Sequence, residues 1–315
     1  MILFSAKISD KHQEKLKQKY SNQRFLFSES DEMTKEYLAE AEVLVTYGSD
    51  VNEQTIQYAP NLKWIMVLSA GVDELPAKLI REKEILVTNA RGIHKTQMAE
   101  YAISMLLQVY RQEKILIENE QAHLWDKSVK VKEITGRTIV IAGTGAIGQE
   151  VARLAKAFQM KTIGVSRRGK NTAYFDENVT NDKLKDVLAE ADFLVSVLPR
   201  TKETSGFFTD DHFNAMPNHG VFLNMGRGDA VSSKVILRAV HENEIAHAVL
   251  DVSEQEPLPK DHPFWSEDKV TITPHISGLS PHYVTRALEI FTKNLEQYLN
   301  GGDDYTNKID LSRGY

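Results

Sequence analysis

Three side chains of the sequence could together move a proton and bind an anion. His275 follows the apolar run 270–272, and an imidazole exchanges a proton near neutral pH. Glu256 could pair with that imidazole and favour its protonated form. Arg227 lies between two glycines, and its guanidinium could bind a carboxylate and polarise a carbonyl group. Taken singly, each residue type is more often an ordinary surface residue, so their positions relative to strand ends, glycines and proline carry the interpretation.

A glycine-rich turn follows the apolar run 138–142 and precedes a helical pattern. Gly143 would permit the tight turn, Gly145 would let a pyrophosphate approach the backbone, and Gly148 would let helix and strand pack closely. The amides at the helix start would hold the phosphates. In this strand-to-helix context we expect a dinucleotide site formed by Gly143, Gly145, Ala146, Ile147 and Gly148, although the same glycines could serve as a simple turn.

The next apolar run, 162–165, should end beside the adenosine ribose. An acidic residue there normally accepts the 2′-hydroxyl, but this sequence has Ser166, Arg167 and Arg168. A hydroxyl and two guanidiniums can bind a 2′-phosphate, whereas a carboxylate would repel it. We therefore expect NADP to be favoured over NAD. The alternative is a solvated loop with two surface arginines.

The first third of the chain alternates short apolar runs with amphipathic stretches, which is typical of βαβ units on a parallel sheet. The runs are 2–4, 25–27, 43–45, 64–68 and 85–87. From Gln97 the apolar spacing becomes i, i+3, i+4 and i+7, and this predicts a long helix that leaves the first domain.

A second series of apolar runs predicts six strands, enough for a dinucleotide-binding sheet. These runs are 138–142, 162–165, 193–197, 221–223, 246–250 and 270–272. The last periodic stretch, 284–299, predicts a helix that stops before Gly301 and Gly302.

The overall composition excludes several classes of protein. A chain of 315 residues is long enough for about two domains. The net charge is −6 and the 38 basic residues are scattered, so no nucleic acid partner is expected. We also find no signal peptide and no membrane span, and we expect a cytoplasmic protein. The chain has no cysteine, which excludes disulfides and thiolate ligands, and no metal site is expected.

Several motifs, in this order, resemble the D-isomer-specific 2-hydroxyacid dehydrogenase family. The resemblance extends from about residue 43 to residue 275. The segments are Ser69-Ala70-Gly71-Val72-Asp73, the glycine turn, Asn224-Met225-Gly226-Arg227-Gly228, Leu250-Asp251-Val252, Glu256-Pro257-Leu258-Pro259 and Thr273-Pro274-His275.

The resemblance implies an enzyme that transfers a hydride between NAD(P)H and a small 2-oxo acid. It assigns His275 as the acid and base, Glu256 as its partner and Arg227 as the group that binds the substrate. It also implies that Asp251 contacts the nicotinamide amide, although Asp251 could instead cap a helix or loop. The remaining implied roles are substrate-binding amides at Ala70, Gly71 and Val72, and a cofactor wall at Pro199 and Thr201. Residues 70–72 could equally form a structural turn.

The family fold implies an α/β protein with two Rossmann-like or flavodoxin-like domains and parallel sheets. Residues 1–95 and 282–315 would form the substrate domain and residues 96–281 the NAD(P)-binding domain, with the active site in the cleft between them. Family members commonly form homodimers, and residues 97–130 would be the dimer arm. Trp125 and Tyr47 could shape a pocket or simply pack.

Two departures favour one branch of the family. The carboxylate of Glu256 fits formate dehydrogenases poorly, since those relatives carry an amide, and no regulatory domain is expected after Tyr315. With the basic pair at 167–168, this favours members that resemble glyoxylate or hydroxypyruvate reductases. One alternative is a corepressor-like binding protein that senses nicotinamide nucleotide without catalysis. Another is a methyltransferase, which would leave the later motifs unexplained.

Overall fold

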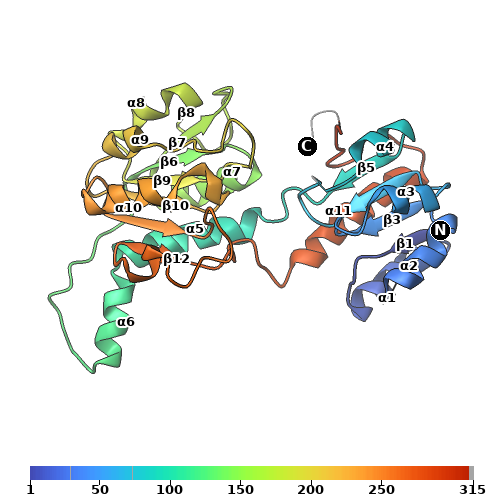
Figure 1. The fold of residues 1–315 in the computed structure, drawn as a ribbon, viewed down its shortest axis with the longest axis horizontal. Coiled ribbons are helices and arrows are strands. Elements are labelled where there is room, and N and C mark those ends of the chain that lie inside the picture. The colour runs from blue at the N-terminus through green and yellow to red at the C-terminus, as the bar shows by residue number, and fades with distance from the viewer. Residues whose placement is uncertain (29, 73, 312–315) are drawn as a thin grey trace. The chain divides into compact units, whose positions relative to one another are not determined.

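The computed structural model describes residues 1–28, 30–72 and 74–311, and it divides the chain into two units (Figure 1). Unit 1 comprises Met1–Ile93 and Ser280–Tyr315, and unit 2 comprises His94–Leu279. Each unit has its own sheet and its own hydrophobic core. No helix among the described residues is both long and apolar enough to cross a membrane.

Unit 1 is built on a parallel sheet of five strands in the order β2-β1-β3-β4-β5. This is the strand order of flavodoxin-like folds. Each strand lies at one of the predicted apolar runs. The strands are β1 (Ile2–Phe4), β2 (Phe25–Phe27), β3 (Val43–Thr46), β4 (Trp64–Val67) and β5 (Leu86–Asn89).

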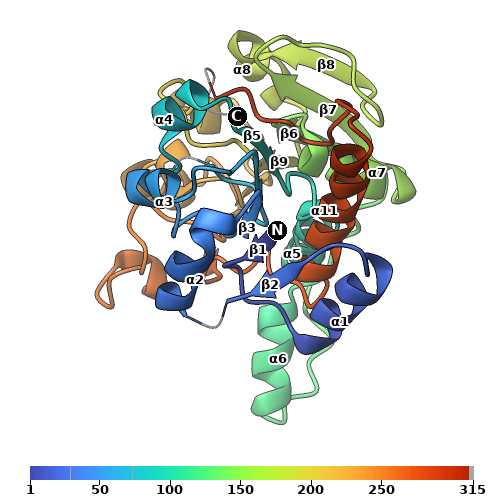
Figure 2. The same ribbon diagram turned by 90° about the vertical axis from the view of Figure 1, so that its right-hand side faces the viewer.

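Helices cover both faces of this sheet, so its strands are apolar on both sides. Leu3, Leu44 and Ile65 pack toward one group of helices, while Phe4, Val45 and Trp64 pack toward the other. Figure 2 shows the two groups on opposite sides of the strands. The first group is α2 (Asp31–Tyr37), η1 (Leu38–Glu40), α3 (Glu53–Tyr58) and α4 (Ala77–Glu82), and the second is α1 (Asp10–Lys19) and α11 (Tyr283–Leu299).

Unit 2 contains a parallel sheet of seven strands in the order β12-β11-β10-β9-β6-β7-β8. Six of them lie at the predicted runs: β6 (Thr138–Ala142), β7 (Lys161–Ser166), β9 (Phe193–Ser196), β10 (Val221–Asn224), β11 (His247–Leu250) and β12 (Val270–Ile272). The prediction of six strands was one short, because β8 (Glu177–Thr180) is a partly exposed edge strand without an apolar run. The order is that of a Rossmann sheet with one further strand beside β11.

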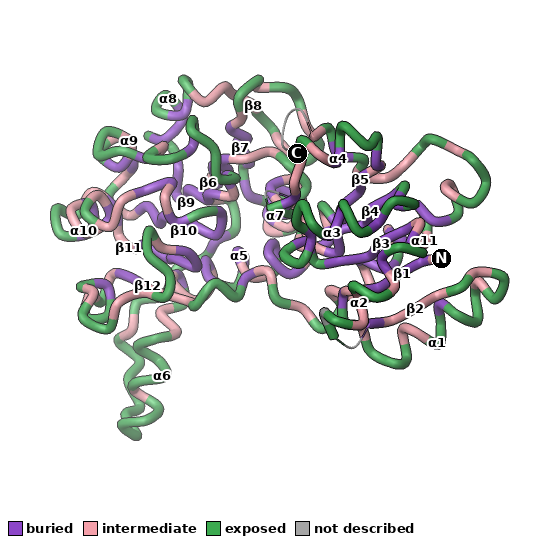
Figure 3. The backbone as a smooth tube through the Cα atoms, turned by 45° about the vertical axis from the view of Figure 1, so that its right-hand side comes forward, coloured by how far each residue is buried: buried purple, intermediate pink, exposed green. Residues whose placement is uncertain are grey.

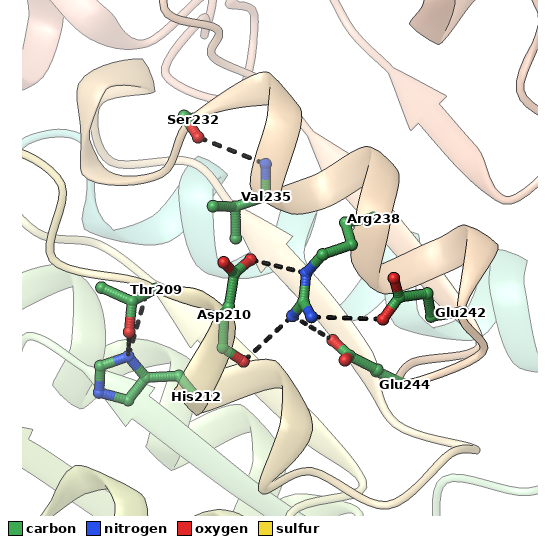
Figure 4. A network of polar contacts seen from close by, with 8 residues as sticks. All are labelled: Thr209, Asp210, His212, Ser232, Val235, Arg238, Glu242 and Glu244. Atoms are coloured by element: carbon green, nitrogen blue, oxygen red, sulfur yellow. Dashed lines mark hydrogen bonds and ion pairs between the residues drawn. The ribbon is translucent and has the colours of Figure 1, made fainter.

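The helices of unit 2 also lie on two faces. One face carries α5 (Lys95–Tyr110) and α7 (Ala146–Ala157), and the other carries α8 (Leu184–Leu188), α9 (Asp210–Asn214) and α10 (Ser233–His241). An ion pair from Arg238 to Asp210 connects α10 with α9, and a second pair joins Arg238 to Glu244 in the loop that follows α10 (Figure 4). The shorter elements are η2 (Asn181–Lys183), η3 (Gly228–Ala230) and η4 (Pro263–Ser266).

The helix α6 (Glu113–Gln121) has no buried residue (Figure 3). Together with residues 122–131 it carries several large apolar side chains that are more than two-fifths exposed. They are Ile115, Leu116, Ile117, Leu124, Trp125 and Val131. We call residues 113–131 the arm.

The register of the unit 2 sheet brings several strand ends into one row. Ala142 pairs with Ser196, Ser196 with Asn224, Asn224 with Leu250, and Leu250 with Ile272. Because all these strands are parallel, the residues that follow them emerge at the same edge of the sheet, where open α/β sheets bind ligands.

Candidate active site

His275 and Glu256 form the one direct contact among the three predicted catalytic side chains. The imidazole Nδ1 lies 2.7 Å from Oε2 of Glu256, and the other carboxylate oxygen accepts the amide of Ser253 at 3.1 Å. Both side chains are partly exposed, at 50% and 39%. A carboxylate fixed in this way stabilises an imidazolium and directs the opposite ring nitrogen, Nε2, away from it. The pair can therefore donate and recover a proton.

The backbone at His275 adopts the left-handed conformation, with φ of 54°. Non-glycine residues adopt this conformation at an energetic cost, so surrounding contacts must hold it. The amide of His275 donates to the carbonyls of Asp251 and Thr273, at 2.9 and 3.0 Å. The strained turn therefore has a defined support on the neighbouring strand end.

Asp251 anchors the same turn through its side chain. The carboxylate is 2% exposed and follows β11 directly. Its Oδ1 accepts the hydroxyl of Thr273 at 2.6 Å and the amide of Ile276 at 2.9 Å, and its Oδ2 accepts the amide of Ser277 at 3.0 Å. Asp251 thus binds the turn before and after His275. The resemblance assigned this residue to the cofactor, with a helix or loop cap as the alternative, and its hydrogen bonds to the amides of Ile276 and Ser277 are those of a loop cap.

Arg227 lies on a tight loop after β10. Asn224, which is fully buried, donates to the Arg227 carbonyl at 3.0 Å and accepts the amide of Gly226 at 3.2 Å. A side chain at Gly228 would lie 1.8 Å from the carbonyl oxygen of Ser253, so only glycine fits there. The guanidinium donates to the carbonyl of Gly226 at 2.8 Å. It forms no ion pair with any residue that the structure describes, so its charge is available to an anion.

A second histidine lies near this arginine. Burial lowers the pKa of His94, and the positive charge of Arg227 lowers it further. The imidazole is therefore neutral at physiological pH. Its ring lies against Gly278, where an added Cβ would lie 3.3 Å from Cδ2. His94 was not predicted as a site residue, because it belongs to none of the sequence motifs.

The glycine turn has the geometry that a dinucleotide requires. Gly143 has φ of +107°, and a Cβ there would lie 2.9 Å from the side chain of Val197. A Cβ at Gly148 would lie 1.9 Å from the carbonyl oxygen of Gly143. At Gly145, by contrast, a Cβ would meet nothing within 4 Å. Gly145 caps the 12-residue helix α7, and Ala146 and Ile147 begin it, so their amides lie at its positive end.

The expected 2′-phosphate site follows β7, and the expected cofactor wall follows β9. Ser166 ends β7, and Arg167 and Arg168 are exposed beyond it. After β9, the hydroxyl of Thr204 shapes a turn by donating to the carbonyl of Pro199 at 2.6 Å and accepting the amide of Thr201 at 2.8 Å.

Arg167 lies close to that turn. The pKa of the exposed Glu203 is lowered first by its own backbone amide and by the hydroxyl of Thr201, and the charge of Arg167 contributes a further lowering. Arg167, Thr201 and Glu203 are therefore neighbours at the carboxyl edge of the sheet.

The predicted substrate loop belongs to unit 1 and follows β4. Asn89 donates to the carbonyl of Ala70 at 2.6 Å, and the hydroxyl of Ser69 donates to the carbonyl of Gly71 at 3.1 Å. The amides of Ala70, Gly71 and Val72 donate to no residue within the described part of the chain, so they can donate hydrogen bonds to a bound anion. Asp73, the last residue of the motif, lies outside the described residues.

Comparison with known proteins identifies relatives along nearly the whole chain. Residues 103–277 match the model of the D-isomer specific 2-hydroxyacid dehydrogenase NAD binding domain. A glyoxylate reductase of Pyrococcus furiosus is 30% identical over 289 residues, which cover 88% of this chain and 86% of that protein.

Solved structures are similar as well. A D-isomer specific 2-hydroxyacid dehydrogenase family protein of Aeromonas salmonicida is 34% identical, with a TM-score of 0.84 and 98% of each chain covered. An NADPH-dependent glyoxylate/hydroxypyruvate reductase of Sinorhizobium meliloti, in complex with NADP and sulfate, is 25% identical. Its TM-score is 0.79, and the match covers 100% of this chain and 99% of that one.

Two of the three glycines of the turn, Gly145 and Gly148, provide a matched pair of variants. Gly145→Ala should keep the melting temperature within about 2 °C of the wild type, since its methyl group meets no protein atom. It should weaken NADPH binding about tenfold or more, because the methyl group occupies the space that a pyrophosphate approaches. Gly148→Ala should lose binding and also melt at least about 5 °C lower, because the turn must move.

Thermal melting and NADPH fluorescence titration of both variants test this. Wild-type NADPH affinity in Gly145→Ala would show that the turn does not hold a dinucleotide.

Proposed function

The chain belongs to the D-isomer specific 2-hydroxyacid dehydrogenase family, and we propose that it reduces a small 2-oxo acid, glyoxylate or hydroxypyruvate first, with NADPH. It is an NAD(P)-dependent oxidoreductase that acts on CH–OH groups. The proposal adds the substrate, the preferred nucleotide and the D-configuration of any chiral product.

The contact between His275 and Glu256 carries this proposal. Reduction of a 2-oxo acid places negative charge on the carbonyl oxygen, which needs a proton. The His275 imidazolium can supply it from Nε2, since Nδ1 is held by the Glu256 carboxylate at 2.7 Å. A bound reduced nicotinamide supplies the hydride. A corepressor-like protein that only senses nucleotide would have no use for an aligned acid and its carboxylate partner.

The substrate carboxylate requires positive or amide groups. We assign Arg227 to the carboxylate and the 2-oxo group, because its guanidinium is exposed and has no carboxylate partner in the described part of the chain. The amides of Ala70, Gly71 and Val72 would complete carboxylate binding. In domain terms, we assign residues 1–95 and 282–315 to the substrate and residues 96–281 to NAD(P).

The cofactor assignment follows the glycine turn and the residues beyond β7. The pyrophosphate would lie over Gly143, Gly145, Ala146, Ile147 and Gly148, with Pro199 and Thr201 along the adenosine. Ser166, Arg167 and Arg168 would bind the 2′-phosphate of NADPH. Asp251 already accepts three hydrogen bonds from its own chain, so contact with the nicotinamide amide would add to its anchoring role.

We also propose a homodimer formed through the arm. Trp125 is 88% exposed and Leu124 57%, and the arm offers no hydrophobic core of its own. Exposed large apolar side chains concentrated in one short segment are typical of a protein interface. A second copy of the chain is the expected partner.

NADPH oxidation by the wild type should be detectable with glyoxylate, hydroxypyruvate or a longer 2-oxo acid. His275→Ala should lower kcat by about 100-fold to 10,000-fold, since a positioned acid contributes that much. His241→Ala is the matched control. His241 forms a similar contact with Glu267, at 2.7 Å, but it is the last residue of α10 and does not lie in a turn that follows a strand end. The decrease in NADPH absorbance gives the rate of each of the three proteins. Equal rates in wild type and His275→Ala would remove the catalytic assignment.

Replacing Arg167 and Arg168 together by alanine should raise the Kd of NADPH about tenfold or more, because charged hydrogen bonds to phosphate are lost. The Kd of NADH should change less than about threefold. Lys161→Ala removes a positive charge at the opposite end of the same strand and serves as the control. Titration of the wild type and of both variants with NADPH and with NADH gives the dissociation constants to be compared. Equal losses for NADPH and NADH would refute the phosphate assignment.

Replacing Ile117 and Leu124 by lysine should convert the dimer to a monomer, because each places a charge in the proposed apolar interface. Tyr58→Lys changes an equally exposed side chain outside the arm, 59% exposed on α3, and should leave the dimer intact. Sedimentation velocity measures the mass of each. A wild-type protein that sediments as a monomer at micromolar concentration would contradict the proposed assembly.

A further inference from the structure

Two side chains of the long helix α5 contact the turn that carries His275, one before the histidine and one after it. The hydroxyl of Tyr101 lies 2.7 Å from Oγ1 of Thr273, two residues before the histidine. The side-chain amide of Gln97 donates to the carbonyl of Gly278, three residues after it, at 3.1 Å. Residues 97 and 101 are one helical turn apart and so share a face of α5.

The direction of the hydrogen bonds can be assigned. Thr273 has one hydroxyl hydrogen, and it is donated to Oδ1 of Asp251 at 2.6 Å. Tyr101 must therefore be the donor to Thr273. Burial raises the pKa of Tyr101, and the nearby charge of Asp251 raises it further. The phenol consequently remains protonated, and remains a donor, throughout the physiological range.

The chain of contacts ends beside the acid. Asp251 accepts the hydroxyl of Thr273 on the same oxygen that accepts the amide of Ile276. Ile276 follows His275 directly. A hydrogen bond donated to Thr273 strengthens the one that Thr273 donates, so the helix fixes the rotamers of Thr273 and Asp251 together. The turn holds His275 in a backbone conformation that needs such support.

We propose that Tyr101 is a positioning residue for the reaction, acting through Thr273 and Asp251 to hold the turn that presents His275. Tyr101 touches neither His275 nor Glu256. Its hydroxyl connects the helix to Thr273, Thr273 donates to Asp251, and Asp251 accepts the amide that follows His275. The inference rests on the proposed function, because turnover is one of its two readouts.

The same helix offers a matched control. Tyr110 also lies on α5, is 2% exposed, and its hydroxyl has no hydrogen-bond partner among the described residues. Tyr110→Phe therefore removes a buried phenolic oxygen from α5 without removing a hydrogen bond. Tyr101→Phe removes the same atom together with the bond to Thr273.

The first test is steady-state reduction of a 2-oxo acid. Tyr101→Phe should lower kcat about tenfold, the equivalent of one buried hydrogen bond, while the KM for NADPH changes less than about twofold. Tyr110→Phe should match the wild type. Thr273→Val should lower kcat at least as much as Tyr101→Phe, whereas Thr273→Ser should retain most of the activity. The double variant Tyr101→Phe, Thr273→Val should have the same kcat as Thr273→Val alone, because both changes break the same chain of hydrogen bonds.

The second test does not need turnover. Hydrogen–deuterium exchange over residues 273–279 should be faster in Tyr101→Phe than in the wild type or Tyr110→Phe, since the amides of Ile276 and Ser277 lose part of their anchor. If Tyr101→Phe does not fold, Thr273→Val and Thr273→Ser carry the same comparison. Wild-type kcat and exchange in Tyr101→Phe would overturn the inference. A wild type without turnover would instead count against the proposed function, and the exchange result would still decide the role of Tyr101.

Discussion

The Asp251 carboxylate lies at 2% exposure and accepts two backbone amides and one hydroxyl from a single turn. A buried carboxylate without such partners would cost several kcal/mol, on the order of the whole stability of many domains. The charge and the turn therefore require each other. The turn cannot open without leaving the charge unsatisfied, and His275 cannot take its left-handed conformation without the turn. The geometry of the acid and its carboxylate partner depends on this one buried group.

The sheet of unit 2 explains why these residues meet. Its parallel strands end in register, so chain segments that are far apart in the sequence leave the sheet at one edge. Gly143, Arg227, Asp251 and His275 all come within three residues of such an end. Asn224 and Asp251 then perform similar tasks on neighbouring strands. Each is a buried polar side chain that closes the backbone of the following loop and so presents an exposed side chain, Arg227 in one loop and His275 in the other.

Much of the fold could be predicted from the sequence because buried parallel strands are uniformly apolar and stand out between amphipathic helices. The same reasoning failed for β8, an edge strand whose residues are polar and partly exposed. The pairing of His275 with Glu256 was also predicted, since a proline adjoins each residue within a family motif. The contacts of Tyr101 and His94 were not predicted, and for Asp251 a loop cap was only the alternative to a cofactor contact. Such contacts depend on which side chains meet across helix and sheet, and the apolar period of α5 does not indicate the partner of the Tyr101 hydroxyl or of the histidine that precedes the helix.

In the proposed reaction a hydride passes from the nicotinamide to the 2-oxo carbon while His275 supplies the proton. A single turnover of glyoxylate with NADPH that carries deuterium at the transferred position of the nicotinamide C4 tests this. We expect glycolate that carries the deuterium on C2, formed rapidly by the wild type. Glycolate without deuterium, or deuterium released to water, would contradict it.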